Sequence, residues 1–384
     1  MARSGGEGHR SARKSGREKR VTLKTVAEHL GVSPATVSVV LNSSPVADAI
    51  PEKTKQRVLQ AARELNYRPN HLARSLRGKR SLSIGVLVPE ISEGWAAGVM
   101  SGVESHLTQE GYFYLMASHR SKADLLEEYL NHLEDRSVDG FILLAALLEK
   151  APDLPTVVVA GHRQIDGVVN VVLDQDLAAR LALEHLSGLG HERIAFFQGA
   201  ASNADAEDRW RAIREAAAEL GLEIDPRLAL QLVAKSYGPV FSPEEGYHEG
   251  HAYGKKLLAT GIPFTALFAF NDVSAIGAMR AFLDAGLRVP EDVSIVGFDD
   301  ILSAAFQNPS LTTVRQPLRE LGETAGRILL QRVEGKNSHP DFVTVEPELV
   351  VRASTGPPRA VPSSVAKSRK GRQVQPAGSR RPAA

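Results

Sequence analysis

From Leu82 onward, short apolar runs alternate with amphipathic stretches of helical periodicity, and this alternation limits the possible folds more than any other feature. Continuous apolar runs predict strands buried on both faces, and helices between them predict parallel pairing through βαβ units. The runs are residues 83–88, 112–117, 140–144, 156–160, 194–198, 266–270 and 294–298. So many parallel strands fit two small α/β lobes better than one sheet.

Residues 21–69 have a different pattern, typical of short helices. Thr22 can cap a first helix, and Gly31 can end it in a left-handed turn. Ser33 can cap a second helix, and Pro34 suits its first position because the missing N–H costs nothing there. Residues 51–65 continue as a third helix. Two short helices joined by a glycine turn predict an all-α helix-turn-helix domain, whose second helix enters the DNA major groove.

Charge is divided unevenly along the chain. The whole sequence has a formal net charge of +1 at pH 7. Residues 1–80 carry +11, residues 81–351 carry −18 and residues 352–384 carry +8. A basic head on an acidic body indicates that one end binds a polyanion, because Lys and Arg gain affinity by releasing counterions from phosphates. A solvated charged surface would give the same counts, so the motifs inside the head have to decide.

Composition excludes several classes of protein. The sequence has no cysteine, which rules out disulfides, iron–sulfur clusters, thiolate zinc sites and a cysteine nucleophile. No apolar run reaches the roughly 18 residues of a membrane span, and no apolar segment follows the basic N-terminus as in a signal peptide. We therefore expect a cytoplasmic protein with no membrane partner. Residues 1–20 and 353–384 are expected to be disordered basic tails.

The head carries a joined string of motifs. These are Val21–Ala27, Gly31–Ser33, Ala35–Ser38, Asn42, Leu65–Asn70 and Ala73–Leu76. Together they resemble the DNA-binding domain of the lactose/galactose repressor family. A helix-turn-helix alone is a common pattern with many false positives, whereas the joined string is specific. The resemblance ranks DNA binding well above a three-helix module with a purely structural role.

The resemblance assigns roles within the helix-turn-helix. Pro34, Ala35 and Val39 would face base edges. The residues expected mainly to contact phosphates are Thr22, Ser33, Thr36, Ser38 and Asn42. Val39 departs from the family, which often has Arg there; Arg binds guanine through two hydrogen bonds, whereas Val offers only apolar contact with a thymine methyl. We therefore expect an altered half-site and more weight on DNA shape.

Residues 70–81 are expected to form a hinge helix and linker. Asn70 can cap a helix so short that it is marginal in water and should order only on DNA. The resemblance implies that paired hinge helices of a dimer lie in the minor groove, where Leu76 opens a base step. The other hinge residues assigned to DNA are Ala73, Arg74 and Arg77. One short helix cannot hold the groove alone, so a homodimer on a pseudo-palindromic operator is expected.

The body resembles the same family and the periplasmic sugar-binding proteins. The best matching strings are Leu189–Ala195, Phe270–Asp272, Gly286–Ser294 and Val296–Asp300. The resemblance implies a periplasmic-binding-protein-like α/β fold of two doubly wound lobes, crossed three times by the chain, around a small-molecule cleft. It predicts an effector-binding and dimerisation core over residues 82–352. Lobe one would cover about 82–172 and 318–345, and lobe two about 173–316 and 346–352.

A small polar effector such as a sugar needs carboxylates and amides for its hydroxyls and an aromatic face for its ring. Asn271 and Asp299 each follow a predicted strand, where α/β folds bind ligands. The resemblance adds Arg209 as a cleft arginine and Phe241 as an aromatic gate. The complete predicted effector site is Trp95, Asn203, Arg209, Phe241, Asn271, Asp299 and Gln316. The two aromatic residues and the first asparagine are equally compatible with packing or surface roles, and Gln316 with a backbone contact.

Signals for catalysis or metal binding are weak. Phosphate-loop and nucleophile-elbow motifs are absent, and Gly188–Gly190 lacks the third glycine of a dinucleotide fingerprint. His248–His251 is one residue short of H-E-x-x-H, so surface histidines are the expected state. Asp299 and Asp300, adjacent on an extended segment, would point opposite ways, which favours ligand contact and structure over a catalytic pair. We predict no catalytic residue, metal or cofactor.

The sequence thus predicts a homodimeric transcriptional regulator, expected to be a repressor, that binds double-stranded operator DNA and responds allosterically to a small polar effector, expected to be a sugar. Departures from the family at Ala160–Arg163 and Glu207 mean that the effector of the lactose repressor is not inherited. The alternative is a solute-binding protein with an incidental basic head. A sugar-modifying enzyme would need an acid and a base in the cleft with separated pKa values, and no such pair stands out.

Overall fold

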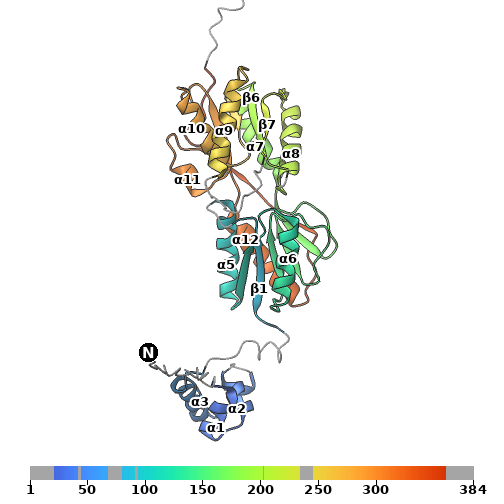
Figure 1. Cartoon of the computed structure of the whole chain (residues 1–384), viewed down its shortest axis with the longest axis vertical. Coiled ribbons are helices and arrows are strands. Elements are labelled where there is room, and N and C mark those ends of the chain that lie inside the picture. The colour runs from blue at the N-terminus through green and yellow to red at the C-terminus, as the bar shows by residue number, and fades with distance from the viewer. Residues whose placement is uncertain are drawn as a thin grey trace, which may run out of the picture. The chain divides into compact units, whose positions relative to one another are not determined.

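The computed structural model describes residues 21–41, 45–67, 80–90, 94–201, 203–233 and 245–359. The chain divides into two compact units, residues 1–81, called the head, and residues 82–384, called the body. The head is helical and the body is α/β (Figure 1). The predicted hinge from residue 70 to 79 lies outside the described residues.

Short helices around a small apolar core form the head. They are α1 (Leu23–Leu30), α2 (Pro34–Leu41), the 3-10 helix η1 (Pro45–Ala49) and α3 (Glu52–Glu64). Apolar residues at helical spacing turn one face of each α-helix inward. The buried cluster is Val26, Ala27, Val37, Val40, Val58 and Ala61. The helix-turn-helix predicted from the sequence is confirmed.

Lobe one of the body is built on a six-stranded parallel sheet of order β11-β5-β4-β3-β1-β2. Its strands are β1 (Ser83–Val88), β2 (Phe113–Ser118), β3 (Phe141–Leu144), β4 (Thr156–Val159), β5 (Val168–Leu173) and β11 (Phe342–Val345). The inner strands β3, β4 and β5 are buried throughout, which explains their unbroken apolar runs. The helices of lobe one are α5 (Trp95–Gln109), α6 (Ala123–Glu134) and α12 (Leu318–Val333).

Lobe two repeats this arrangement with a six-stranded sheet of order β12-β10-β9-β8-β6-β7, in which only β12 is antiparallel. The strands are β6 (Ile194–Gln198), β7 (Ala229–Gln231), β8 (Ala266–Phe268), β9 (Ser294–Asp299), β10 (Thr312–Arg315) and β12 (Glu348–Val350). The helices are α7 (Gln175–Gly188), α8 (Ala206–Glu219), α9 (Glu245–Ala259), α10 (Asp272–Asp284) and α11 (Leu302–Ala305). The chain passes between the lobes after β5, after β10 and after β11.

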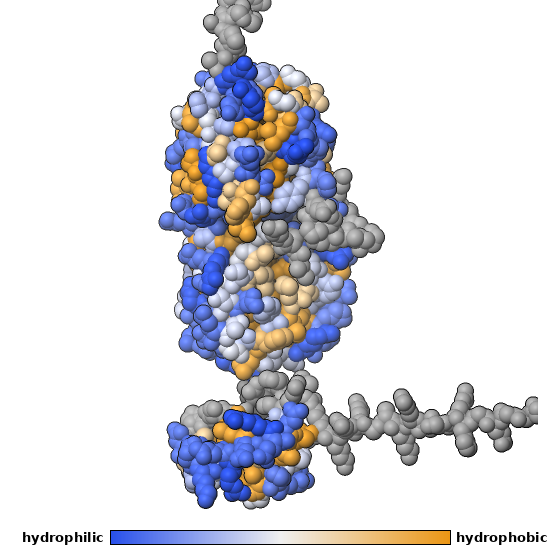
Figure 2. Space-filling model, turned by 90° about the vertical axis from the view of Figure 1, so that its left-hand side faces the viewer, coloured by the Kyte–Doolittle hydropathy of each residue, from blue (hydrophilic) through white to orange (hydrophobic). Residues whose placement is uncertain are grey.

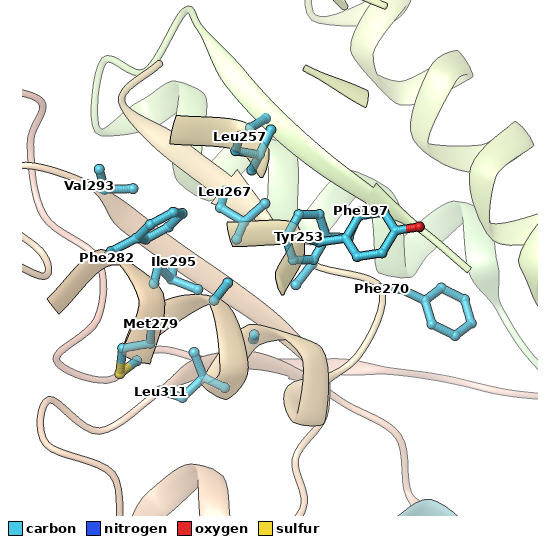
Figure 3. Packing of buried hydrophobic residues seen from close by; sticks show 14 of the residues in the cluster. Phe197, Tyr253, Leu257, Leu267, Phe270, Met279, Phe282, Val293, Ile295 and Leu311 are labelled. Carbon is cyan, nitrogen blue, oxygen red and sulfur yellow. The ribbon is translucent and has the colours of Figure 1, made fainter. Parts of the chain in front are cut away.

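Helices cover both faces of each sheet (Figure 1). On one face of lobe two, β-strand residues pack with α9 and α10, and the rings of Phe197 and Tyr253 meet edge to face with centroids 6.0 Å apart (Figure 3). Phe270 lies at the margin of this cluster, apart from Phe282 (Figure 3). The two sandwiches confirm the predicted fold class of two doubly wound lobes.

Glycines let one helix pair cross closely in each lobe. A Cβ on Gly102 of α5 would lie 2.0 Å from the carbonyl oxygen of Arg319, and one on Gly322 of α12 would lie 2.0 Å from that of Val99. In lobe two, a Cβ on Gly250 of α9 would lie 2.3 Å from the carbonyl oxygen of Ser274. Only glycine fits these crossings without moving the backbone.

All seven predicted runs are strands, but five strands were missed: β5, β7, β10, β11 and β12. β7 and β12 have only three residues each, and β5 and β10 carry buried polar residues. Asn170 interrupts β5, and Thr312 and Thr313 open β10; all three are buried. Their polar groups are satisfied internally, because the Asn170 amide donates to the carbonyl of Arg163 and Thr313 donates to Asp272.

The C-terminal tail predicted from residue 353 is wrong for its first part, because residues 353–359 pack on lobe two. Ser354 is fully buried, and its hydroxyl donates to the carbonyl of Ile295 at 2.6 Å. The backbone N–H of Ala353 donates to Ser310. This segment lacks large apolar residues, and hydrogen bonds from its backbone and its serine hydroxyl hold it on lobe two instead. Residues 1–20 and 360–384 lie outside the described part.

Exposed apolar side chains mark parts of the body surface. On the face in Figure 2, hydrophobic patches interrupt a mostly hydrophilic surface in both lobes. The most exposed large apolar residues of the described body are Phe113 at 65%, Leu302 at 73% and Phe306 at 79%. Phe113 belongs to β2, at one edge of its sheet. An edge strand with exposed apolar residues is a site where another chain can pack.

Candidate functional sites

Side-chain caps fix the turn between the first two helices of the head. Thr22 caps α1 and forms a reciprocal capping box with Thr25. Gly31 ends α1 with φ of 66°, a conformation that glycine adopts without strain. The Ser33 hydroxyl accepts a hydrogen bond from the N–H of Thr36 at 3.0 Å and so begins α2. The caps predicted for these two helices are present.

The second helix, α2, has an inward and an outward face. Val37 and Val40 are buried in the head, whereas Pro34 and Ala35 are exposed and Val39 is half-buried. A second helix with an exposed face of small residues can approach base edges in the major groove. The residues predicted to read bases therefore lie where the head's core leaves α2 accessible.

The other predicted DNA-binding residues divide into two groups. Thr22 and Ser33 are exposed, and Thr36 and Ser38 are half-buried on α2. The predicted residues that lie outside the described part of the chain are Asn42, Asn70, Ala73, Arg74, Leu76 and Arg77. Their roles, including the wedge at Leu76, stay predictions.

A cavity of about 670 Å³ opens between the two lobes of the body. Segments that follow β3 and β4 form its lobe-one wall, and the segment after β6 with the first turns of α8 forms its lobe-two wall. Its polar and aromatic lining includes His162, Asn170, Gln198, Asn203, Asp208 and Trp210. The cavity thus lies at the carboxyl ends of parallel strands from both sheets, where α/β folds bind ligands.

Arg209 is the centre of a buried polar network behind this cavity. The residue is 3% exposed, and its guanidinium donates to the carbonyl oxygen of Phe270 at 2.7 Å and to Gln175 Oε1 at 3.1 Å. It also lies 3.5 Å from Asp205 Oδ2 and 3.6 Å from the ring centroid of Phe298. Burial lowers the pKa of Arg209, and the charges of nearby carboxylates oppose that effect. The buried guanidinium of Arg209 therefore fixes the positions of the Asp205 carboxylate and of the Phe270 and Phe298 segments around it.

Asp299, at the end of β9, completes the network. It is 6% exposed and accepts a hydrogen bond from Gln316 Nε2 at 2.6 Å. Burial raises the pKa of Asp299 to about 7, against the opposing influence of the Arg209 cation. Arg209, Asp299 and Gln316, three residues of the predicted effector site, therefore lie in one buried cluster.

The segment holding Asp299 and Asp300 is not extended, as the sequence analysis assumed. Their φ angles are 112° and 56°. Asp300 pairs with Arg315 at 2.7 Å and Arg352 at 2.6 Å, while Asp299 bonds Gln316. The two carboxylates diverge because of positive-φ turns, and each has separate partners.

The remaining predicted effector residues are placed differently. Asn203 lines the cavity, and its Oδ1 accepts from the N–H of Asp205 at 2.9 Å. Asn271 caps α10 by accepting from the N–H of Ser274 at 2.9 Å. Trp95 begins α5, and its buried indole N–H has no hydrogen-bond partner among the described residues. Phe241 lies outside the described residues.

Sequence reasoning missed His162, the residue that joins the lobes. His162 follows β4 in lobe one, and its Nε2 lies 2.5 Å from Oδ1 of Asp205 at the start of α8. Its Nδ1 lies 3.4 Å from Asp208 Oδ2. The available signals were a histidine directly after an apolar strand and two acids flanking Arg209, but nothing in the sequence pairs them.

The other candidates for chemistry have structural partners. His251 Nε2 lies 3.1 Å from Asp284 Oδ2, and with Arg280 it lowers the pKa of that carboxyl. In the described ranges, no three His, Asp or Glu side chains gather as metal ligands would. None of the helices described is both long and apolar enough to span a membrane.

A helix-turn-helix with an accessible second helix, carried on one chain with a two-lobed body around an interlobe cavity, defines a DNA-binding regulator that responds to a small molecule. Comparison with known proteins agrees. Residues 22–70 match the model described as bacterial regulatory proteins, lacI family, and residues 183–355 match that of a periplasmic binding protein-like domain. The chain belongs to the lacI family of bacterial regulatory proteins.

The alignments with curated relatives span nearly the whole length of those relatives. The HTH-type transcriptional repressor PurR of Aliivibrio fischeri (strain MJ11) is 33% identical over 347 residues, which is 87% of this chain and 98% of the relative. The repressor of the same name from Pasteurella multocida (strain Pm70) is 33% identical over 345 residues, with the same coverage. The predicted transcriptional regulator is therefore confirmed over the solute-binding alternative.

Solved structures show the same architecture. The lac repressor dimer bound to operator and the anti-inducer ONPF superposes with a TM-score of 0.76 at 29% identity, covering 88% of this chain and 100% of that one. The complex of the transcriptional regulator CelR with cellobiose superposes with a TM-score of 0.62 at 30% identity, covering 87% and 100%.

Proposed function

We propose that this chain is a homodimeric repressor that binds a pseudo-palindromic operator and is controlled by a small polar effector bound between its lobes. The observation that carries the proposal is the cavity of about 670 Å³ at the carboxyl ends of strands from both sheets. A ligand there touches both lobes at once, so its binding energy favours one lobe arrangement over another. We further propose that the protein is not an enzyme and acts in the cytoplasm, where operator DNA is.

The chemistry of the cleft favours a ring with several hydroxyl or amide groups. Asn203, Gln198 and Asp208 offer acceptors and donors on the cavity wall, and Trp210 offers an aromatic side chain. Asp299 and Arg209 do not line the cavity; they lie in the buried network next to it and would hold the lining residues of α8 in position. Trp95 does not line this cavity, but its buried indole N–H has no hydrogen-bond partner among the described residues, so we propose it as a further donor. The solved neighbour with cellobiose supports a sugar. A nucleobase, a flat ring whose nitrogens and oxygens also hydrogen-bond to amides, is the second class to test.

Exposed apolar residues support the proposed homodimer. Phe113 and Met116 on the edge strand β2 are 65% and 41% exposed. Leu302 and Phe306 in and after α11 are still more exposed. Exposed apolar residues of this kind are covered when two copies pair, and the solved lac repressor neighbour is a dimer. Pairing two bodies would then make the spacing of two heads depend on lobe arrangement.

The first experiment is selection of bound fragments from the source genome by the purified full-length protein at near-physiological salt. Recovery of one palindromic sequence is expected, and its neighbouring genes would point to the effector. The selection is repeated with a panel of sugars and nucleobases, of which one should change the retained fraction. Random fragments with and without every panel compound would contradict sequence-specific regulation.

Matched variants of the head test the recognition helix. Ala35→Glu places a carboxylate on the exposed face of α2, where it would meet phosphates and base edges, and should weaken binding of the selected fragment at least about tenfold. Gln56→Glu adds the same charge to the exposed face of α3 and should leave binding near the parent value. Equal losses would show that net charge alone, not the α2 face, governs binding.

A further inference from the structure

Two ion pairs of His162, with Asp205 and with Asp208, link lobe one to the α8 region of lobe two. His162 stands on the segment after β4, and its partners Asp205 and Asp208 stand at the start of α8. The side chain of His162 is 19% exposed and that of Asp205 is 9% exposed. The pair therefore lies mostly out of water, beside the interlobe cavity that His162 and Asp208 line.

The geometry favours one charge state of His162. Its Nε2 faces Asp205 at 2.5 Å, and its Nδ1 faces Asp208 at 3.4 Å. A neutral imidazole has one donor nitrogen and one acceptor nitrogen, so it would turn a lone pair toward one of the two carboxylates. Only the imidazolium donates from both nitrogens. The observed position of the two lobes therefore suits His162 in its protonated form, with each ring nitrogen donating toward a carboxylate.

The surrounding charges support the imidazolium. Burial lowers the pKa of His162, but the hydrogen bond and charge of Asp205, together with Asp208, leave it above the ordinary value. Arg209 on α8 acts in the opposite direction. The remaining charged residues around the same cavity are Arg163, Glu207, Arg211 and Arg214. Arg211 pairs with Asp208 at 2.9 Å as well as with Asp176 and Glu215, so Asp208 is shared between Arg211 and His162. His162 is the lobe-one cation that pairs with Asp205.

We propose that His162 is a proton-dependent latch between the two lobes: its imidazolium binds Asp205 and Asp208 and holds the cleft closed. Loss of that proton removes one donor and places a lone pair against a carboxylate, so the closed arrangement loses stability relative to the open one. Proton concentration then acts on the same equilibrium as the effector. This last step rests on the proposed function, whereas the latch itself does not.

The latch sets the direction of the pH dependence. A histidine whose pKa is raised by its partners stabilises the closed form fully below its ordinary value of about 6.5. That stabilisation is lost as pH rises through the raised pKa of the closed form. Closure should therefore be strongest near pH 5.5 and weakest near pH 8.5. Each unit by which the closed form raises this pKa changes the ratio of closed to open molecules by about tenfold.

Distance measurement between spin labels tests this directly. The chain has no cysteine, so Glu127→Cys on α6 and Glu223→Cys just after α8 would be the only labelled positions. Both residues are exposed, and α6 and α8 belong to different lobes (Figure 1). In the full-length protein, the longer-distance population should grow severalfold between about pH 5.5 and about pH 8.5.

Two variants and one control make the result specific. His162→Gln donates to at most one carboxylate and does not titrate, so the longer distance should dominate at both pH values. Asp208→Asn removes one anion and should reduce the pH response without abolishing it. His132→Gln removes a histidine that pairs with Glu128 inside α6, and should keep the parent response. A parent protein without any pH response, or a full response in His162→Gln, would overturn the latch.

The selected operator fragment separates the latch from the proposed function. If the latch and the function both hold, the effect of pH on fragment retention is lost in His162→Gln and kept in His132→Gln. A missing distance response in a protein that still selects a palindrome overturns the latch alone. A distance response in a protein that selects no palindrome supports the latch and contradicts the proposed repressor.

Discussion

The two lobes share a plan and differ in what they bury. Each has a six-stranded doubly wound sheet and one helix pair that crosses through glycines. Among the described residues, however, the buried charged side chains belong to lobe two: Asp205, Arg209, Asp272 and Asp299. The buried polar residues of lobe one are neutral, such as Thr156 and Asn170, and burial lowers the pKa of its His119.

This difference separates folding from binding. Lobe one shows that the same topology closes around an aliphatic and aromatic interior without buried charge. The charges of lobe two are therefore not needed to form such a sheet, and they gather where strands β6, β8 and β9 end beside the interlobe cavity. Lobe two thus holds the preorganised polar groups of the proposed effector site, and lobe one contributes its cover and His162.

The largest expected effect comes from removing the buried cation. Arg209→Met should lower the free energy of unfolding by about 3–5 kcal/mol, because Asp205 and Asp299 would lose their compensating charge. Urea denaturation measures the loss. Arg211→Met on the same helix removes a side chain that is 37% exposed, and should cost less than about 1 kcal/mol. Similar losses in both variants would mean that burial does not make the Arg209 charge more important for stability than the exposed charge of Arg211.

A smaller effect, equal in the two lobes, is expected at the glycine crossings. Gly102→Ala in lobe one and Gly250→Ala in lobe two should each cost about 1–3 kcal/mol, since each new methyl would meet a backbone carbonyl. Gly188→Ala, at the end of α7, meets no atom within 4 Å and should be neutral or slightly stabilising. Unfolding monitored by circular dichroism compares the three. A large loss in only one lobe would break the parallel between their packing.

The sequence revealed the shared plan better than the difference between the lobes. Uninterrupted apolar runs such as β3 and β4 were predictable because both faces of an inner parallel strand are buried. β10 was not, because Thr312 and Thr313 interrupt the apolar pattern, and the partners of their hydroxyls, Thr355 and Asp272, come from distant parts of the chain. β11 pairs with β5 from a segment far along the chain, and no local pattern encodes that pairing.

The candidate site was predictable to a similar extent. Resemblance and position after a strand identified Arg209 and Asp299. Neither could show that the Arg209 guanidinium is saturated by internal partners, since Gln175 and Phe270 come from other elements. His162 was missed because its partner Asp205 belongs to the other lobe and meets it only in the folded body.

A still smaller effect should appear as a pH slope rather than a loss at one pH. Burial raises the pKa of Asp299 to about 7, so the folded protein binds a proton that the unfolded chain has already lost above pH 4. Stability should therefore fall as pH rises from about 4 to about 7, and Asp299→Asn should flatten this slope. Urea midpoints at pH 5 and pH 8 measure it.

The control for that slope is an exposed aspartate of the same lobe. Arg227 lowers the pKa of Asp225 to about 2, so Asp225 titrates below the measured range. Asp225→Asn should keep the parent slope between pH 5 and pH 8. If Asp299→Asn keeps the parent slope as well, Asp299 does not titrate as its surroundings indicate, and the slope comes from other groups such as Asp272, whose pKa burial also raises.

The smallest effect on stability is expected in lobe one, at Trp95. Trp95→Phe removes an indole N–H that has no partner in the described structure, so no hydrogen bond is lost and the free energy of unfolding should change by less than about 1 kcal/mol. If that N–H donates to the effector, the same variant should still retain the operator fragment but lose its response to the active panel compound. An unchanged response would show that Trp95 does not contact the effector and that lobe two and His162 recognise it. The contrast would then be between a lobe two that binds the effector through polar groups and a lobe one that mainly covers it.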